Sequence, residues 1–192
     1  MKVSDLVVKC LENEGVKHVF GVPGEEIEDL LFSLEASSIT FIPTRHEQGA
    51  AFMADVWGRL TGTAGVCLST LGPGATNLMT GVADANLDKS PLVAITGQTG
   101  LRQIHKDSHQ YLDIVSLFRP ITKWNTAMSS PEAVAEAVRK AFKVAESEKP
   151  GAAHLELPED VAKMETSGRP IAVHRVRRPD PDQHALREAV AL

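Results

Sequence analysis

A charged and polar tetrapeptide, Arg45-His46-Glu47-Gln48, leads directly into a helix-forming stretch of small and apolar residues that ends near Gly62. An acid in the first turn of a helix is stabilised by the helix dipole, so Glu47 alone fits an ordinary solvated helix end. The alternative is that Glu47 points into a site, where a carboxyl group is a candidate for proton transfer. These residues by themselves leave both interpretations open.

A glycine-rich turn is the second candidate, with the sequence Leu71-Gly-Pro-Gly-Ala-Thr-Asn77. Its glycines permit a tight turn with close backbone approach, and a helix N-terminus beside such a turn can hold an anion. Asn77 occupies the position of the third glycine in the dinucleotide fingerprint, and the Gly-Lys-Ser/Thr of a Walker A loop is missing. The pattern therefore leaves open a site loop and a purely structural turn.

Two histidines, His105 and His109, have the spacing of metal ligands on a helix. A third ligand at zinc-like spacing is missing, so solvated or substrate-facing histidines are favoured and no metal site is predicted. The sequence has no G-x-S-x-G motif, which argues against a serine hydrolase. Cys10 and Cys67 lie far apart in apolar surroundings and are predicted to be buried free thiols.

Strand and helix patterns alternate along the chain, which predicts an α/β fold: a three-layer α/β/α domain with a mostly parallel sheet. Ser4 is the expected N-cap of the first helix, and Gly15 is expected to end it. Strands are predicted at 18–22, 40–43, 65–70, 91–96 and 152–157, with an edge strand at 121–126, and helices at 4–14, 25–34, 48–60, 75–86 and 131–147.

Ligands of such folds bind beyond the carboxyl ends of the strands. The informative residues follow the predicted strands: Pro23-Gly24 the first, His46-Glu47 the second, the glycine-rich turn the third and Gly97-Gln98 the fourth. The sequence thus predicts a site at this edge of the sheet.

Composition excludes several other classes. The net charge of -5 argues against a general nucleic-acid binder. The sequence contains no run of about 18 apolar residues, so no membrane span is predicted. The N-terminus has the charges of an amphipathic helix and lacks the features of a signal peptide, so a cytoplasmic location is expected.

The C-terminal region differs in character. Arg175, Arg177 and Arg178 precede Pro179-Asp-Pro-Asp182, which is typical of an exposed linker, and a new amphipathic helix then begins. We expect one domain at 1–160, a linker at 161–182 and the start of a second domain at 183–192. On this interpretation the chain is a fragment of a longer protein.

Three stretches, GVPGEEIEDLL, RHEQGAAFMADVWGRLTG and STLGPGATNLMTGVADANLDKSPLVAITGQ, resemble in order and spacing the N-terminal pyrimidine-binding (PYR) domain of thiamine-diphosphate enzymes. The resemblance covers about Met1 to Pro158 and is strongest to the acetolactate synthase and pyruvate oxidase group. HQYLDIVSLFRPITKW is similar to acetolactate synthases in particular. His109 precedes Gln110 as in catabolic members, whereas many biosynthetic members have Phe there, which leaves the subtype open.

The resemblance assigns the central role to Glu47, which matches the glutamate that hydrogen-bonds N1′ of the cofactor's aminopyrimidine. A carboxylic acid held in an apolar pocket can share a proton with that nitrogen, which prepares the thiazolium for attack on a 2-oxo acid and for decarboxylation. Gln110 matches an active-site glutamine near the reacting carbon and the substrate, and Lys123 a lysine near the substrate entrance. Cofactor contacts are expected at Pro23, Gly24, Thr70, Pro73 and Asn77.

The resemblance also implies parts that this chain lacks. The diphosphate and its Mg2+ are held in the family by a separate domain with a Gly-Asp-Gly motif, which is missing from this sequence. The fragment alone is therefore expected to be inactive. It is expected to form a homodimer or higher homo-oligomer through the helices after Glu47 and Gly74. FAD in a central domain stays open.

The leading hypothesis is an acetolactate synthase that condenses two pyruvates with release of CO2, a reaction used in branched-chain amino acid biosynthesis. Alternatives are a pyruvate oxidase, or a carboligase or decarboxylase for glyoxylate, oxalyl-CoA, sulfoacetaldehyde or an aryl 2-oxo acid. Glu47 argues against glyoxylate carboligase, which lacks that glutamate. A subunit of a split decarboxylase and a pure interaction domain are further alternatives. The unfinished final helix argues against the split subunit, and Glu47 against the interaction domain.

Overall fold

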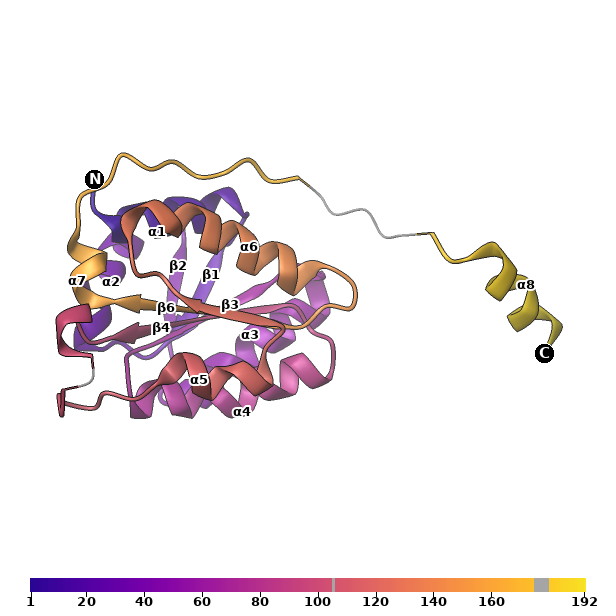
Figure 1. The fold of residues 1–192 in the computed structure, drawn as a ribbon, viewed down its shortest axis with the longest axis horizontal. Coiled ribbons are helices and arrows are strands. Elements are labelled where there is room, and N and C mark those ends of the chain that lie inside the picture. The colour runs from indigo at the N-terminus through magenta and orange to yellow at the C-terminus, as the bar shows by residue number, and fades with distance from the viewer. Residues whose placement is uncertain (105, 175–179) are drawn as a thin grey trace.

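A six-stranded, all-parallel sheet forms the centre of the computed structural model, which describes residues 1–104, 106–174 and 180–192. The strand order is β2-β1-β3-β4-β6-β5, so β2 and β5 are the edges. This confirms the predicted three-layer α/β/α class, including the edge position of the strand expected near 121–126 (Figure 1). The strands are β1 (His18–Gly21), β2 (Thr40–Pro43), β3 (Gly65–Ser69), β4 (Leu92–Gln98), β5 (Trp124–Ala127) and β6 (Ala152–Pro158).

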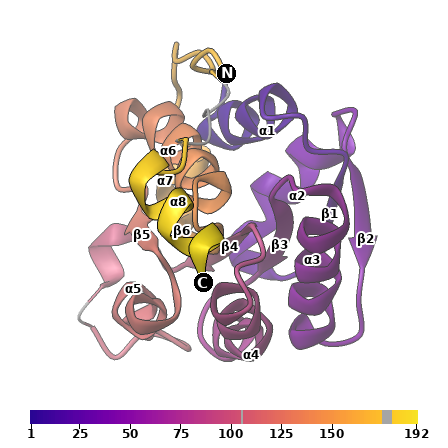
Figure 2. The same cartoon turned by 90° about the vertical axis from the view of Figure 1, so that its right-hand side faces the viewer.

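Helices cover both faces of the sheet, as the end-on view makes clear (Figure 2). One face carries α1 (Val3–Asn13), α2 (Glu28–Glu35), α6 (Val134–Glu146) and α7 (Glu159–Lys163). The opposite face carries α3 (Glu47–Thr61), α4 (Pro73–Leu87) and α5 (Ile114–Phe118). Short 3-10 turns are η1 (Glu25–Ile27), η2 (Leu101–Gln103), η3 (Arg119–Ile121) and η4 (Pro131–Ala133), and α8 (Gln183–Ala191) follows near the C-terminus.

The two sides of the sheet have different cores. Large aliphatic side chains fill the space under α1, α2 and α6, whereas alanines dominate the contact of α3 and α4 with the sheet. The small residues bring α3 and α4 close together: a Cβ added at Gly81 would lie 2.6 Å from the Cβ of Ala51. Both cysteines are buried and free, as predicted, and burial raises the pKa of each thiol.

Arg59 joins the exposed ends of α3 and α4. Its guanidinium group forms ion pairs with Asp55 one turn earlier on α3, with Asp84 on α4 and with Asp88, which directly follows α4. Such partly exposed pairs contribute little individually, but a network that links two helices fixes their relative position. The close approach of α3 and α4 therefore has both an apolar and an ionic basis.

Two local predictions are wrong. Ser4 lies inside α1 and is not its N-cap, because Lys2 precedes the helix and the hydroxyl of Ser33 donates a hydrogen bond to the Ser4 hydroxyl in the core. Gly97 and Gln98 belong to β4 and do not follow it, because backbone pairing with β6 continues to Gln98 and Pro158. Gln98 thus has the fixed orientation of a strand residue.

The chain directly after β6 still packs on the domain. Val161 and Ala162 of α7 are buried, and Lys2 forms an antiparallel bridge with Glu165. The boundaries expected at residues 160 and 182 stay predictions. Arg175, Arg177, Arg178 and Pro179 of the expected linker lie outside the described residues.

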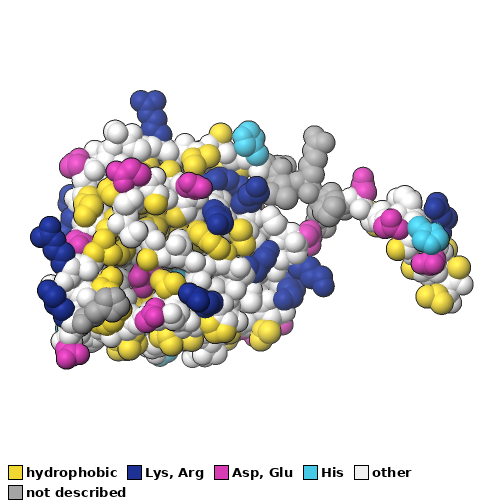
Figure 3. Space-filling model, viewed as in Figure 1, with side chains coloured by type: hydrophobic (Ala, Val, Ile, Leu, Met, Phe, Trp, Pro, Cys, Tyr) yellow, Lys and Arg dark blue, Asp and Glu magenta, His cyan; other side chains and the backbone are white. Residues whose placement is uncertain are grey.

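The side chain of Asp182 accepts hydrogen bonds from the backbone N–H groups of His184 and Ala185, which caps α8. None of the α8 residues is buried, and its surface carries apolar as well as charged side chains (Figure 3). Within the described ranges, none of the helices has the length and apolar character needed to cross a membrane.

Two glycines of α3 provide a matched test of the close packing on this side of the sheet. A Cβ at Gly58 would lie 2.2 Å from the carbonyl oxygen of Pro91, whereas a Cβ at Gly49 would meet no atom within 4 Å. We expect Gly58→Ala to lower the free energy of unfolding by about 1–3 kcal/mol through overpacking. Gly49→Ala should raise it by up to about 1 kcal/mol through helix propensity. Urea denaturation of both variants measures this, and equal losses would contradict the packing described.

Candidate active site

Glu47 is the first residue of α3 and directly follows the turn after β2. His46 precedes the helix as its N-cap, and its Nδ1 accepts a hydrogen bond from the backbone N–H of Gln48 at 3.1 Å. The His46 cap leaves the side chain of Glu47 free to turn inward, and the residue as a whole is only 9% exposed. The ordinary solvated helix end is thereby excluded for Glu47.

Asn77, one turn into α4, holds the Glu47 carboxyl group. Its side-chain Nδ2 donates a hydrogen bond to Oε2 of Glu47 at 3.0 Å. The two residues belong to different helices, so the contact depends on the close packing of α3 and α4. The amide fixes the orientation of the carboxyl group and leaves Oε1 turned toward the glycine-rich turn.

That turn is shaped to leave room beside Glu47. Pro73 begins α4 in the first-turn position that suits proline. A Cβ added at Gly74 would lie 2.8 Å from Cγ2 of Thr70 and 3.4 Å from Oε1 of Glu47. A side chain at Gly74 would therefore fill the space that borders the carboxyl group, which identifies the turn as part of the site.

The segment after β1 meets the same place. A Cβ added at Gly24 would lie 2.5 Å from Cβ of Thr70, and Pro23 lines an open groove next to Gly24. The hydroxyl of Thr70 donates a hydrogen bond to Oε2 of Glu26 at 2.5 Å. Glu26 is a second carboxylate at this edge that the sequence analysis did not identify.

Gln110 lies against the other side of the glycine-rich turn. Gly72 has φ +53°, and a Cβ there would lie 2.4 Å from the carbonyl oxygen of Gln110. Both the left-handed backbone and the close approach require glycine at this position. Gln110 itself has φ 55°, and its side chain is exposed. The structure thus brings Gln110 to the same edge of the sheet as Glu47.

Lys123 does not join this group. It precedes β5, at the amino edge of the sheet, where its backbone N–H pairs with the carbonyl of Ala152. Its amine donates hydrogen bonds to the carbonyl oxygens of Val144 and Ser147 at the end of α6. These contacts assign it a helix-capping role in this chain, and the expected role at a substrate entrance stays a prediction.

The histidine pair noted in the sequence gives no metal site in the described structure. His109 is exposed, and His105 lies outside the described residues. Among the residues that the structure describes, no group of three or more His, Cys, Asp or Glu side chains could hold a metal ion.

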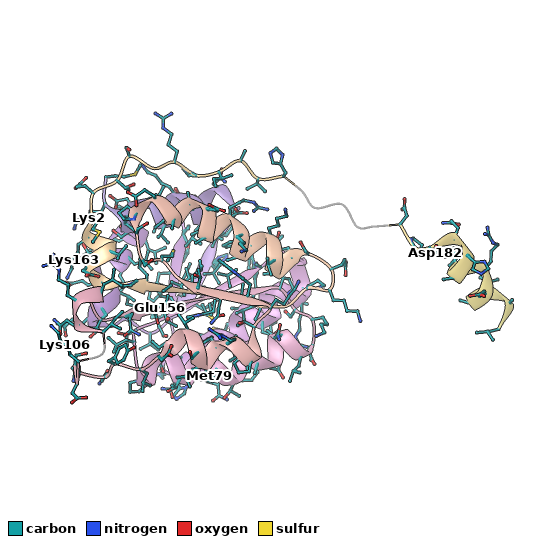
Figure 4. All side chains as sticks on the ribbon, in the orientation of Figure 1. Lys2, Met79, Lys106, Glu156, Lys163 and Asp182 are labelled. Carbon is teal, nitrogen blue, oxygen red and sulfur yellow. The ribbon has the colours of Figure 1, made fainter. Side chains whose placement is uncertain are left out.

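A row of polar side chains on β4 and β6 faces α5 and the loop that carries Gln110. The sequence placed Gln98 at the predicted site edge but gave no role to Thr96, His154 or Glu156. Gln98 is 1% exposed and Glu156 is 4% exposed, and Nε2 of Gln98 donates to Oε2 of Glu156 at 3.1 Å. Nearer the sheet centre, Thr96 and His154 are in hydrogen-bond contact, and the ring of Phe118 stacks on His154. Glu156 lies within the body of the domain (Figure 4).

Burial shifts the pKa values of this row in opposite directions. The pKa of Glu156 is raised to about 7, chiefly by burial and to a smaller extent by the nearby charge of Asp113, against the lowering effect of the hydrogen bond from Gln98. Burial lowers the pKa of His154 to about 3, so the buried imidazole is neutral. A signal for these residues exists in the sequence, since PLVAITGQ and AAHLEL each place polar residues two apart in an apolar strand.

Comparison with known proteins shows the family of the chain. The family model described as "Thiamine pyrophosphate enzyme, N-terminal TPP binding domain" matches residues 1–117, more than half of the chain. The chain therefore belongs to this family of thiamine-pyrophosphate-binding domains. The resemblance to a pyrimidine-binding domain of thiamine-diphosphate enzymes is thereby confirmed.

Curated relatives carry more specific names. A probable acetolactate synthase large subunit from Methanocaldococcus jannaschii is 47% identical over 161 residues, which is 84% of this chain and 27% of the relative. The catabolic acetolactate synthase of Raoultella terrigena is 42% identical, covering 98% of this chain and 34% of the relative. The large subunit of acetolactate synthase isozyme 1 from Escherichia coli is 37% identical, covering 98% of this chain and 34% of the relative. The chain spans about a third or less of the length of these relatives.

The raised pKa of Glu156 predicts a pH-dependent stability difference. Below about pH 4.5 the acid is protonated in both the folded and unfolded chain, so it contributes no pH dependence. Between that value and about pH 7, the unfolded chain ionises while the folded chain resists ionisation, so wild-type stability falls relative to Glu156→Gln. The difference should reach about 3 kcal/mol above pH 7.

Urea denaturation of wild type and Glu156→Gln from pH 4.5 to 8.5 measures this difference, and subtraction removes the opposite trend from His154. Glu136→Gln, on the exposed side of α6, is the matched control and should follow wild type. A difference between wild type and Glu156→Gln that does not vary with pH would contradict the assignment.

Proposed function

We propose that this chain is the pyrimidine-binding part of an acetolactate synthase, a transferase that decarboxylates pyruvate and joins the resulting hydroxyethyl group to a second 2-oxo acid. The observation that carries the proposal is the buried Glu47 carboxyl group, oriented by Asn77 at the carboxyl edge of a parallel sheet. The names of the relatives support the reaction, and membership of the thiamine-pyrophosphate-binding family supports the cofactor.

The residues present fit the aminopyrimidine ring of thiamine diphosphate. The space beside Gly74 borders Oε1 of Glu47, the oxygen that Asn77 does not contact. We infer that this oxygen holds a proton shared with ring nitrogen N1′ of the aminopyrimidine, while Asn77 keeps the carboxyl group in place. The bound cofactor supplies an electron sink for decarboxylation. Gly74 and Gly24 keep the ring's approach open, because a side chain at either would collide with Thr70.

The proposal assigns roles to further residues of the same site. Pro23, Thr70 and Pro73 border the pyrimidine, and Gln110, held against Gly72, contacts the substrate. In the proposed complete enzyme a second domain holds Mg2+ and the diphosphate. FAD, anabolic or catabolic subtype, a role in branched-chain amino acid biosynthesis and a cytoplasmic location stay predictions.

The test uses the complete gene product with thiamine diphosphate, Mg2+ and pyruvate, and measures acetolactate and CO2. We expect wild type to form acetolactate and Glu47→Gln to lose about 10²–10⁴-fold in rate, the usual contribution of general acid–base catalysis. Glu136→Gln, on the exposed side of α6, should keep full activity.

Each other outcome has a distinct meaning. CO2 or acetate without acetolactate would assign a decarboxylase or oxidase with the same cofactor. Absence of pyruvate turnover with cofactor bound would overturn the acetolactate assignment and point to another 2-oxo acid. Full activity of Glu47→Gln would remove Glu47 from the mechanism.

We also propose that a second copy of the chain packs on α3. The outward face of this helix exposes a row of apolar side chains, with Met53 47%, Val56 48% and Leu60 82% exposed. Together with Phe20, Phe52 and Trp57 they line an almost wholly apolar groove of about 400 Å³. A continuous apolar patch on one helix is typical of a protein–protein interface.

Introducing a charge into this row should weaken self-association. We expect Met53→Glu to raise the dimer dissociation constant of the complete gene product at least about tenfold, because a buried unpaired carboxylate is costly. Phe32→Glu, on α2 of the opposite face and 59% exposed, is the control and should leave association unchanged. Sedimentation over a range of concentrations distinguishes the two, and an unaffected Met53→Glu dimer would place the interface elsewhere.

A further inference from the structure

We propose that Gln98 and Glu156 are positioning residues that hold the loop carrying Gln110 in its working place, an inference that rests on the proposed function of Gln110. Neither residue belongs to the group around Glu47. Both lie in strands, Gln98 at the end of β4 and Glu156 in β6. Their role would be to connect the rigid sheet to a segment that has little regular structure of its own.

The side-chain amide of Gln98 is fully engaged. Its Nε2 donates one hydrogen bond to the carbonyl oxygen of Leu112 in the loop, at 2.9 Å, and one to Oε2 of Glu156, at 3.1 Å. Its Oε1 accepts from the backbone N–H of Thr99 at 3.0 Å. A primary amide has two N–H donors, and here each has its own acceptor. The orientation of the amide, and with it the place of Leu112, is therefore fixed.

The contact with Gln98 connects the loop to the sheet, whereas the backbone hydrogen bonds from Ser108 to Lys106 and from Tyr111 to Ser108 lie within the loop itself. Residues 106–113 contain neither helix nor strand. The carbonyl of Gln110 packs against Gly72, and Asp113 caps α5 by accepting a hydrogen bond from the backbone N–H of Ser116. The Leu112 carbonyl lies between these two points. This carbonyl also accepts a hydrogen bond from the backbone N–H of Ile114 at 2.9 Å, so loss of the Gln98 donor would remove its connection to β4 and loosen the part of the loop next to Gln110.

Glu156 makes the attachment of the loop to the sheet sensitive to pH. The loop contributes Asp113 and Tyr111 to its surroundings, and both are coupled electrostatically to Glu156. Its own strand contributes the neutral His154, and β4 contributes the uncharged Gln98. Ionisation of Glu156 places a second anion near Asp113, whereas opening the loop would let water reach the carboxylate. By linkage, the closed loop is favoured at low pH and opening is favoured as pH rises through about 7.

Two substitutions at Glu156 separate the hydrogen bond from the charge. Glu156→Gln keeps an acceptor oxygen for Gln98 and cannot ionise. Glu156→Leu removes the acceptor and leaves an N–H of Gln98 without its partner. Gln98→Met removes the donors to both Leu112 and Glu156 at similar side-chain size. It therefore tests the attachment of the loop to the sheet without changing Glu156.

The experiment measures amide hydrogen exchange of the 106–118 segment in the complete gene product at pH 6 and pH 8, corrected for the intrinsic pH dependence of exchange. We expect wild-type protection of this segment to fall about tenfold from pH 6 to pH 8. Glu156→Gln should stay protected at both pH values. Glu156→Leu and Gln98→Met should lose about tenfold in protection at both, the usual effect of one buried hydrogen bond.

Protection of α6 (Val134–Glu146) in the same samples reports whether each variant is folded. If Glu156→Leu loses protection in α6 as well, Glu156→Gln and Gln98→Met decide the question. Wild-type and Glu156→Gln loops with the same pH dependence, or a Gln98→Met loop as protected as wild type, would overturn the proposal.

Steady-state kinetics with pyruvate adds an independent comparison. Gln98→Met should lower kcat at both pH values, and Glu156→Gln should keep at pH 8 the kcat that it has at pH 6. If the predicted exchange pattern is found without pyruvate turnover, the positioning role of Gln98 and Glu156 is supported and the proposed function is overturned. Pyruvate turnover as proposed, with exchange unaffected by every variant, would overturn the loop support alone.

Discussion

The hydrogen bond between Asn77 and the buried carboxyl group of Glu47 is the contact on which the rest of the site depends. It joins the first residue of α3 to a residue one turn into α4, and these helices come close enough only because alanines and Gly81 line their contact. The Arg59 ion pairs fix the far ends of the same helices. A buried acid is costly to place in a protein unless it has partners. Here the packing of the whole α3–α4 side provides that partner.

The parallel sheet arranges the remaining parts around this contact. Every strand ends at the same edge, so the segments after β1, β2 and β3 converge on Thr70 and Glu47, although they are distant in sequence. The polar row on β4 and β6 extends the site sideways to the loop of Gln110. Rigid strands therefore support both the group that is proposed to meet the cofactor and the loop that is proposed to meet the substrate.

The sequence predicted much of this arrangement because the strong signals are local. Apolar runs ending in glycine and proline located the strands, and the small residues after Glu47 indicated a closely packed helix. Gln98 and Glu156 were missed as a pair because they are 58 residues apart and meet only through the register of β4 and β6. Lys123 matched a motif, but its position before β5 puts it at the amino edge, away from Glu47. Ser4 was misassigned because its hydroxyl bonds across to α2 and not along its own helix.

The most direct test of the account is a crystal structure of the complete gene product with thiamine diphosphate bound. We expect an oxygen of Glu47 to lie within hydrogen-bond distance, about 2.6–3.2 Å, of N1′ of the aminopyrimidine. Asn77 should still donate to the other oxygen of the same carboxyl group, with the ring beside Gly74. A pyrimidine ring bound away from α3, with Glu47 contacting only Asn77, would contradict the central claim.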